Sequence, residues 1–180
     1  MSDYITRVSA KASDMFCAED WPGLLRACYR HAQYSPDPST QVAAMVLDRD
    51  GAILSLAKNE FPLGVLYLPE RWERPGKYKY IEHAERNSLY ECAQLGFATG
   101  GATMVAPWAA CADCARAIIQ CGLARLVRHK QAGDRSPAFW AEEIAYADTM
   151  LAEAGVEVID VDADLSSGVE LLHSGQLWVP

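Results

Sequence analysis

Two short motifs constrain the fold of this chain more than any other feature: His83-Ala84-Glu85 and Cys111-Ala112-Asp113-Cys114. Each stands at the start of a predicted helix, and a predicted strand lies between the two helices. The cysteines are three residues apart, so both lie on one helix face near the N-terminal end, where the helix dipole favours thiolate over thiol. His83 and Glu85 can converge with them only at a metal beyond the helix ends. The motifs therefore predict a fold that brings two helix N-termini together.

The apolar pattern of the remaining sequence predicts alternating helices and strands. The predicted elements are a helix over 20–34, strands over 40–47 and 52–57 joined by the turn Asp50-Gly51, a helix over 83–95, a strand over 102–106, a helix over 111–121, a strand over 124–127, a helix over 136–154 and a strand over 156–161. Alternation after an initial hairpin predicts an α/β fold with three layers, α-β-α. Its centre would be a mixed five-stranded sheet with helices on both faces.

The 180 residues predict a single domain, 1–180, with a core over about 20–161. Residues 59–82 form a loop-rich insertion that contains three prolines and two glycines, and a connection of this length is usually functional or mobile. Residues 162–180 are expected to form an irregular C-terminal tail.

The charge of the chain argues against one class of substrate. The net charge is −8 and the pI is about 4.9, whereas proteins that hold a polynucleotide backbone usually present a basic stripe. The basic residues form only one loose group, Arg71, Arg74, Lys77 and Lys79. We therefore expect a small-molecule substrate and no DNA or RNA; a single phosphate needs only one or two basic side chains.

No stretch has the eighteen or so consecutive apolar residues of a membrane span, so no membrane association is expected. Residues 1–16 mix charged and apolar side chains and do not resemble a signal peptide, which favours a cytoplasmic location and reduced cysteines. The other cysteines, namely Cys17, Cys28, Cys92 and Cys121, stand alone among apolar neighbours and are expected to be small buried residues.

His83, Cys111 and Cys114 are the inventory of a catalytic zinc site with one open position for water, and Glu85 is the candidate proton shuttle. Two alternatives stay open. A lone Cys-x-x-Cys could be a redox pair, and a structural zinc would need a fourth ligand. His31, His129 and His173, the remaining histidines, have no convincing spacing to the cluster. The joint His-x-Glu and Cys-x-x-Cys pattern favours zinc-dependent deaminase chemistry, with one Zn²⁺ per subunit.

Over residues 20–161 the chain resembles the deoxycytidylate (dCMP) deaminase branch of the cytidine deaminase superfamily. Four segments carry the resemblance: Ser35 with Asp37-Pro38-Ser39-Thr40-Gln41-Val42, Asn59 with Phe61-Pro62 and Gly64, Tyr80 with His83 to Asn87, and Cys111 to Gly122. The resemblance implies a cytidine-deaminase-like fold and hydrolysis of dCMP to dUMP and ammonia. It also implies a homo-oligomer, commonly a hexamer among relatives.

By position, the resemblance implies that Asn59 contacts the pyrimidine nucleoside and that the backbone N–H of Ala84 meets the ring carbonyl oxygen. Trp108 would either line the base pocket or be a core aromatic. The family's glycines flanking Asn59 are missing, as are its basic residues at positions 34 and 36. Inherited control by deoxynucleoside triphosphates is therefore not expected. The substrate could instead be another small base, a nucleoside or a 5-substituted cytosine nucleotide.

Overall fold

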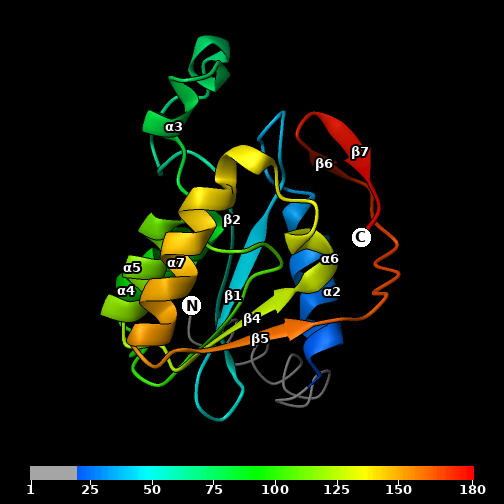
Figure 1. Cartoon of the computed structure of the whole chain (residues 1–180). Coiled ribbons are helices and arrows are strands. Elements are labelled where there is room, and N and C mark those ends of the chain that lie inside the picture. The colour runs from blue at the N-terminus through cyan, green and yellow to red at the C-terminus, as the bar shows by residue number, and fades with distance from the viewer. Residues whose placement is uncertain (1–19) are drawn as a thin grey trace, which may run out of the picture.

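A computed structural model describes residues 20–180 (Figure 1). Its helices, with the short 3-10 segments, are α2 (Trp21–Ala32), η1 (Pro69–Trp72), α3 (Lys77–Tyr80), α4 (Ala84–Leu95), α5 (Ala112–Gln120), α6 (Lys130–Gly133), η2 (Ala138–Trp140) and α7 (Ala141–Glu153). Its strands are β1 (Ala43–Leu47), β2 (Ile53–Lys58), β3 (Thr103–Val105), β4 (Arg125–His129), β5 (Glu157–Val161), β6 (Leu171–His173) and β7 (Gln176–Trp178). The predicted order through β5 is confirmed. The predictions for residues 1–16 and Cys17 lie outside the described residues.

Five strands form one mixed sheet in the order β2-β1-β3-β4-β5. Strand β1 is antiparallel to both of its neighbours, whereas β3, β4 and β5 run parallel to one another. The parallel strands are connected through α5 and α7, as crossover connections require. The predicted mixed sheet is confirmed, and the structure adds the strand order.

Alternate side chains of each central strand enter two separate cores. Ala44, Val46 and Met104 pack with α4, α5 and α7 on one face of the sheet. Their neighbours Met45 and Val105 pack with α2 on the other face. All five residues of β1 are buried, as expected for a strand covered on both sides. This arrangement confirms the three-layer α-β-α prediction.

Local signals in the sequence fix the ends of several elements. The side chain of Asp20 caps α2 by accepting a hydrogen bond from the N–H of Gly23 at 2.9 Å. Helix α4 ends at Gly96, whose φ of 75° lies in the left-handed region that glycine adopts without a steric penalty. The predicted helix at Ser136 begins later, because residues 138–140 form the 3-10 segment η2 before α7.

The prediction of an irregular tail is confirmed for residues 162–170 and wrong for residues 171–178. Residues 171–178 form an antiparallel hairpin, β6–β7, with His173 paired to Gln176 across a two-residue turn. Three-residue strands are too short for a period-2 pattern to be recognised in the sequence. The hairpin owes its order to packing, because Leu171 is buried in the same core as α2. We call residues 171–178 the C-terminal hairpin.

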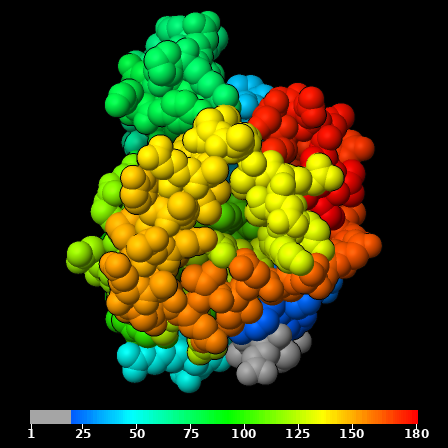
Figure 2. Space-filling view, in the orientation of Figure 1, coloured from blue at the N-terminus to red at the C-terminus, as the bar shows by residue number. Residues whose placement is uncertain are grey.

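The loop-rich insertion projects from the body of the molecule beside the N-terminal end of α7 (Figure 1, Figure 2). It contains η1 and the single-turn helix α3. Across residues 20–180, no helix combines the length and the apolar character needed to cross a bilayer. Cys28 and Cys92 are buried as predicted, whereas Cys121 is partly exposed.

Candidate active site

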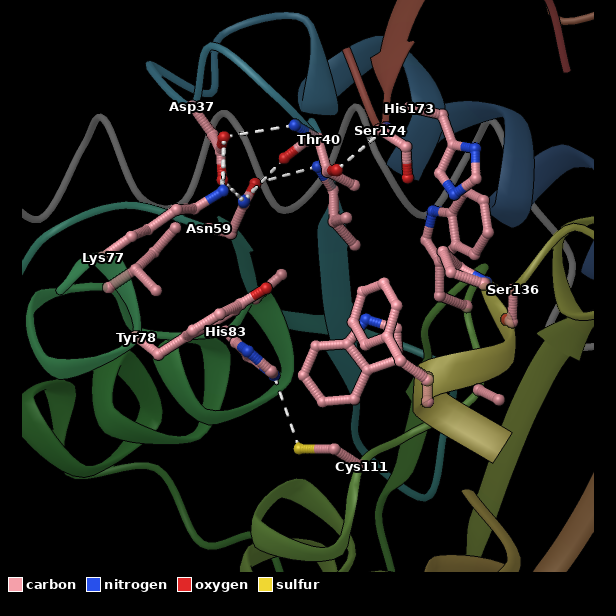
Figure 3. A pocket seen from close by; sticks show the side chains of 18 of the residues that line it. Asp37, Thr40, Asn59, Lys77, Tyr78, His83, Cys111, Ser136, His173 and Ser174 are labelled. Carbon is pink, nitrogen blue, oxygen red and sulfur yellow. Dashed lines mark hydrogen bonds and ion pairs between the residues drawn. The ribbon is translucent and has the colours of Figure 1, made fainter. Parts of the chain in front are cut away.

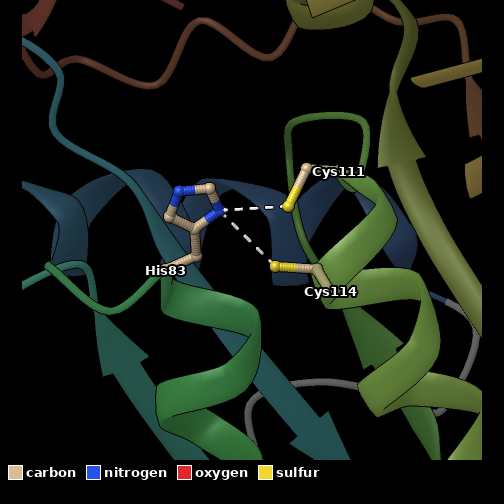
Figure 4. A group of neighbouring side chains, drawn as sticks. All are labelled: His83, Cys111 and Cys114. Carbon is tan, nitrogen blue, oxygen red and sulfur yellow. Dashed lines mark hydrogen bonds between the residues drawn. The ribbon is translucent and has the colours of Figure 1, made fainter. Parts of the chain in front are cut away.

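Two helix N-termini meet at the predicted metal ligands. His83 directly precedes α4, Cys111 directly precedes α5, and Cys114 lies in the first turn of α5. The Nδ1 atom of His83 is 3.5 Å from the Sγ atom of each cysteine, and the three ligand atoms lie within 4.8 Å of one another (Figure 4). This is the convergence beyond the helix ends that the motif spacing predicts.

The donor set fits zinc. Two cysteine sulfurs and one imidazole nitrogen are ligands that Zn²⁺ takes in catalytic sites, where a fourth position stays open for water. Within residues 20–180, the cluster holds these three ligands and no fourth His, Cys, Asp or Glu. That composition favours a catalytic metal over a closed structural zinc.

Without a metal, the thiols of Cys111 and Cys114 have very different pKa values. The interaction between the two sulfurs lowers the pKa of Cys111 and raises the pKa of Cys114 well above its usual value. Burial adds to the rise at Cys114, while the nearby imidazole of His83 helps to keep Cys111 ionised. In the metal-free site Cys111 is therefore the more readily ionised of the two thiols.

We expect zinc to displace the proton of Cys114, because only thiolates are metal ligands. Zinc added to metal-free protein at pH 7 should acidify a weakly buffered solution, and the apparent zinc affinity should rise with pH. An indicator dye measures the released protons. The variant Cys114→Ser lacks one of the three ligands, so it should neither bind zinc nor release protons when zinc is added. Zinc binding without proton release would contradict this charge assignment.

Glu85 is the second residue of α4 and is 4% exposed. Its carboxylate lies outside the ligand cluster but lines the same pocket as His83 and Cys111. Burial raises the pKa of Glu85. A carboxyl group with a raised pKa can accept and return a proton near neutral pH, which is the chemistry of a general acid–base.

A pocket opens beside the ligand cluster (Figure 3). His83 and Cys111 lie at one end of it, and Thr40, His173 and Ser174 lie at the other. Aromatic side chains form much of the wall between them, namely Tyr78, Trp108, Phe139 and Trp140. A mostly apolar wall with a few convergent polar groups is typical of a small-molecule site.

Asn59 lines the pocket, but its amide is fully engaged within the protein. The Oδ1 atom accepts from the N–H of Val42 and the hydroxyl of Ser35, at 2.8 and 2.7 Å. The Nδ2 atom donates to Asp37 and to the carbonyl of Thr40, at 3.0 and 2.8 Å. These four bonds use the hydrogen-bonding capacity of the amide, so Asn59 fixes the loop over residues 35–42. Its contact with substrate stays a prediction.

Ala84 and Trp108 also line the pocket. Ala84 is the first residue of α4, so its N–H has no partner within the helix and is available to a ligand. Trp108 stacks on His173, with ring centroids 4.4 Å apart and an interplanar angle of 16°. It is therefore a pocket-lining aromatic, packed against a segment far away in the sequence.

The structure separates the four basic residues of the insertion. Arg74 and Lys77 line the pocket, whereas Arg71 and Lys79 do not. Lys77 is buried and its ammonium forms an ion pair with Asp37 at 2.6 Å. The guanidinium of Arg74 lies 5.7 and 5.6 Å from the ring centroids of Tyr78 and Phe139. Among residues 20–180, no carboxylate forms an ion pair with Arg74.

Several pocket residues were not predicted from the sequence: Tyr78, Ser136, Phe139, Trp140, His173 and Ser174. Trp140 lies within the helix predicted over 136–154, which the sequence does not connect with the site, yet its ring centroid is 6.0 Å from that of His83. For the C-terminal residues, the one available signal was the dipeptide Ser174-Gly175, a common turn sequence.

Comparison with known proteins gives a consistent result. A family model, "Cytidine and deoxycytidylate deaminase zinc-binding region", matches residues 19–130. An "Uncharacterized deaminase in luxG 3'region" of Aliivibrio fischeri is 33% identical over 135 residues, which are 73% of this chain and 86% of that protein. The deoxycytidylate deaminase of Homo sapiens is 28% identical over 130 residues, covering 68% of this chain and 71% of that protein.

A solved structure shares the fold. The dCMP deaminase from cyanophage S-TIM5, in complex with dCMP and dUMP, superposes with a TM-score of 0.59 at 21% sequence identity. The similarity covers 77% of this chain and 93% of the phage protein.

Proposed function

The chain belongs to the cytidine and deoxycytidylate deaminase family, a family of zinc-dependent hydrolytic enzymes, and from this premise we propose that it converts dCMP to dUMP and ammonia. The observation that carries the proposal is the convergence of His83, Cys111 and Cys114 beside the buried carboxylate of Glu85, at one end of an aromatic-lined pocket. In this proposal the cytosine ring lies next to the ligand cluster, and the sugar and phosphate lie toward the other end of the pocket.

In this proposal His83, Cys111 and Cys114 hold one zinc ion per subunit. Zinc at such a site lowers the pKa of water and so supplies a nucleophile at neutral pH. Glu85 accepts a proton from the attacking water and delivers it to the ring nitrogen. A second transfer through Glu85 protonates the amino group, which leaves as ammonia while the oxygen of water becomes the new carbonyl. The N–H of Ala84 donates to the existing ring carbonyl, and Trp108 bounds the base.

Arg74 is our candidate for recognition of the phosphate. The positive charge of Lys77 is already matched by Asp37, whereas the guanidinium of Arg74 lines the pocket without an ion-pair partner among residues 20–180. An arginine presents several N–H donors in one plane, which suits the oxygens of a phosphate.

The variant Arg74→Gln should raise KM for dCMP about tenfold or more, because a charged hydrogen bond typically contributes about 1.5–3 kcal/mol. The KM for deoxycytidine, which carries no phosphate, should stay within about twofold. Steady-state deamination assays with both substrates measure this difference. Lys79→Gln is the matched control, since Lys79 lies in the same insertion and outside the pocket lining. An equal rise in KM for both substrates would contradict a role for Arg74 in phosphate binding.

A second candidate is deamination of a base, a nucleoside or a 5-substituted cytosine nucleotide at the same site. It is favoured by Tyr34 and Pro36, which replace two basic residues of the family, and by the neutralisation of Lys77. Ammonia release from cytosine, cytidine, deoxycytidine, CMP, dCMP, 5-methyl-dCMP, guanine and a single-stranded oligonucleotide decides between the two. Faster turnover of deoxycytidine than of dCMP would favour the second candidate.

Assembly is also part of the proposal. The family resemblance implies a homo-oligomer, and light scattering of the zinc-loaded protein tests it. The net charge of −8 supports small-molecule substrates over polynucleotides. The cytoplasmic location stays a prediction.

A further inference from the structure

The C-terminal hairpin lies outside the part of the chain that matches the family model, yet it is fixed to one end of the pocket. The N–H of Gly175 donates to the carbonyl of Ser39 at 2.8 Å, and the N–H of Gln41 donates to the carbonyl of Leu172 at 2.9 Å. The N–H of Ser174 donates to the hydroxyl of Thr40 at 3.1 Å. These bonds hold the hairpin against the segment that leads into β1.

Aromatic packing fixes the same hairpin from its other side. The indole of Trp178 meets the ring of Tyr29 edge-on, with centroids 5.6 Å apart. It also meets Trp108 edge-on at 5.3 Å, and Trp108 stacks on His173. Because Trp108 stands three residues before the ligand Cys111, the hairpin and the loop that leads to the metal ligands form one packed unit.

The turn of the hairpin places a serine in the left-handed backbone region. Both central residues have positive φ, 51° at Ser174 and 79° at Gly175. Such two-residue turns favour asparagine, aspartate or glycine at the first position, so serine is held there against its own preference. Backbone strain of this kind is common at ligand-binding positions. Here the strained residue lines the pocket, together with its neighbour His173.

His173 presents an uncharged imidazole. Burial lowers its pKa, and the positive charge of Arg135 lowers it further. An uncharged imidazole can donate or accept a hydrogen bond but forms no ion pair with a phosphate. It therefore suits a hydroxyl group, and the sugar of a 2′-deoxynucleoside 5′-monophosphate has one free hydroxyl, on its 3′ carbon.

We infer that His173 and Ser174 bind the 3′-hydroxyl of the substrate's sugar, which makes the C-terminal hairpin the specificity element for the part of the nucleotide that does not react. Both residues lie across the pocket from His83 and Cys111, where the reacting base must lie (Figure 3). This inference rests on the proposed function, because it takes the cytosine ring to lie at the ligand cluster.

The test compares dCMP with 2′,3′-dideoxy-CMP, which lacks only the 3′-hydroxyl. In the zinc-loaded parent, kcat/KM should be about five- to tenfold higher for dCMP, as expected for one net hydrogen bond. The variant His173→Phe keeps an aromatic ring for stacking on Trp108 and removes both ring nitrogens. The variant Ser174→Gly removes the hydroxyl and places a residue that adopts positive φ freely at the turn. In both variants the preference should fall toward one.

Gln176→Ala is the matched control, because Gln176 is exposed on the same hairpin and does not line the pocket. It should keep the full preference for dCMP, and all variants should keep one zinc per chain. If His173→Phe and Ser174→Gly both keep the parental preference, the inference is wrong and the hairpin only supports the fold. A zinc-loaded parent that does not deaminate dCMP would overturn the proposed function instead, together with the assignment of the sugar.

Discussion

Replacement of Glu85 by glutamine should lower kcat for dCMP by about 10²–10⁴, the range that a positioned acid–base group contributes. Glutamine has nearly the same shape as glutamate but cannot shuttle a proton. Because the carboxylate of Glu85 lies outside the cluster formed by His83, Cys111 and Cys114, the variant should keep one zinc per chain. Ammonia release and metal analysis of the same sample measure the two quantities together.

Glu91→Gln is the matched control for this variant, since Glu91 lies on the same helix and outside the pocket lining. It should retain parental turnover. A Glu85→Gln enzyme with a rate within about tenfold of the parent would exclude a shuttle role for Glu85. Loss of zinc from that variant would show instead that the carboxylate supports the metal site.

Replacement of Cys111 by alanine should remove zinc and with it all measurable deamination. The variant leaves two of three protein ligands, His83 and Cys114, and a zinc site of this kind needs all three. Zinc per chain after dialysis should fall from about one to near zero. The melting temperature of the variant should no longer rise when zinc is added, because a metal stabilises only a native state that binds it.

Cys121→Ala provides the control. Cys121 directly follows α5, the helix that Cys111 precedes, and takes no part in the ligand cluster. Its variant should keep both zinc and activity. Full zinc retention in Cys111→Ala would contradict the assigned ligand set, and retained activity without zinc would contradict metal dependence itself.

The elements that position the metal ligands could be predicted from the sequence because local signals and apolar periodicity agree there. The spacing of His83 and Glu85 requires a metal beyond the helix ends, and the structure places two helix starts side by side at that point. The Cys-x-x-Cys spacing itself indicates that Cys111 and Cys114 bind one metal. The five-stranded sheet follows from alternating elements, whereas the strand order depends on long-range pairing that periodicity does not encode.

The rest of the pocket could not be predicted, because it depends on contacts between distant segments. His173 stacks on Trp108 because the C-terminal hairpin packs on α2, and strands of three residues give no sequence signal for that packing. In the sequence, Arg74 and Lys77 are equally good candidates for binding a phosphate. Only the structure distinguishes them, because Lys77 forms a buried ion pair with Asp37. Asn59 matches a family motif, yet its hydrogen bonds show that it also holds a loop in place.

The sheet divides the interior into two cores, and the pocket draws on both. Cys111 and Cys114 are anchored in the core formed with α4, α5 and α7. The C-terminal hairpin is anchored through Leu171 in the core formed with α2. A nucleotide that reaches from one anchor to the other would therefore contact residues held by both cores. Substrate binding would then make the two cores unfold together rather than one at a time.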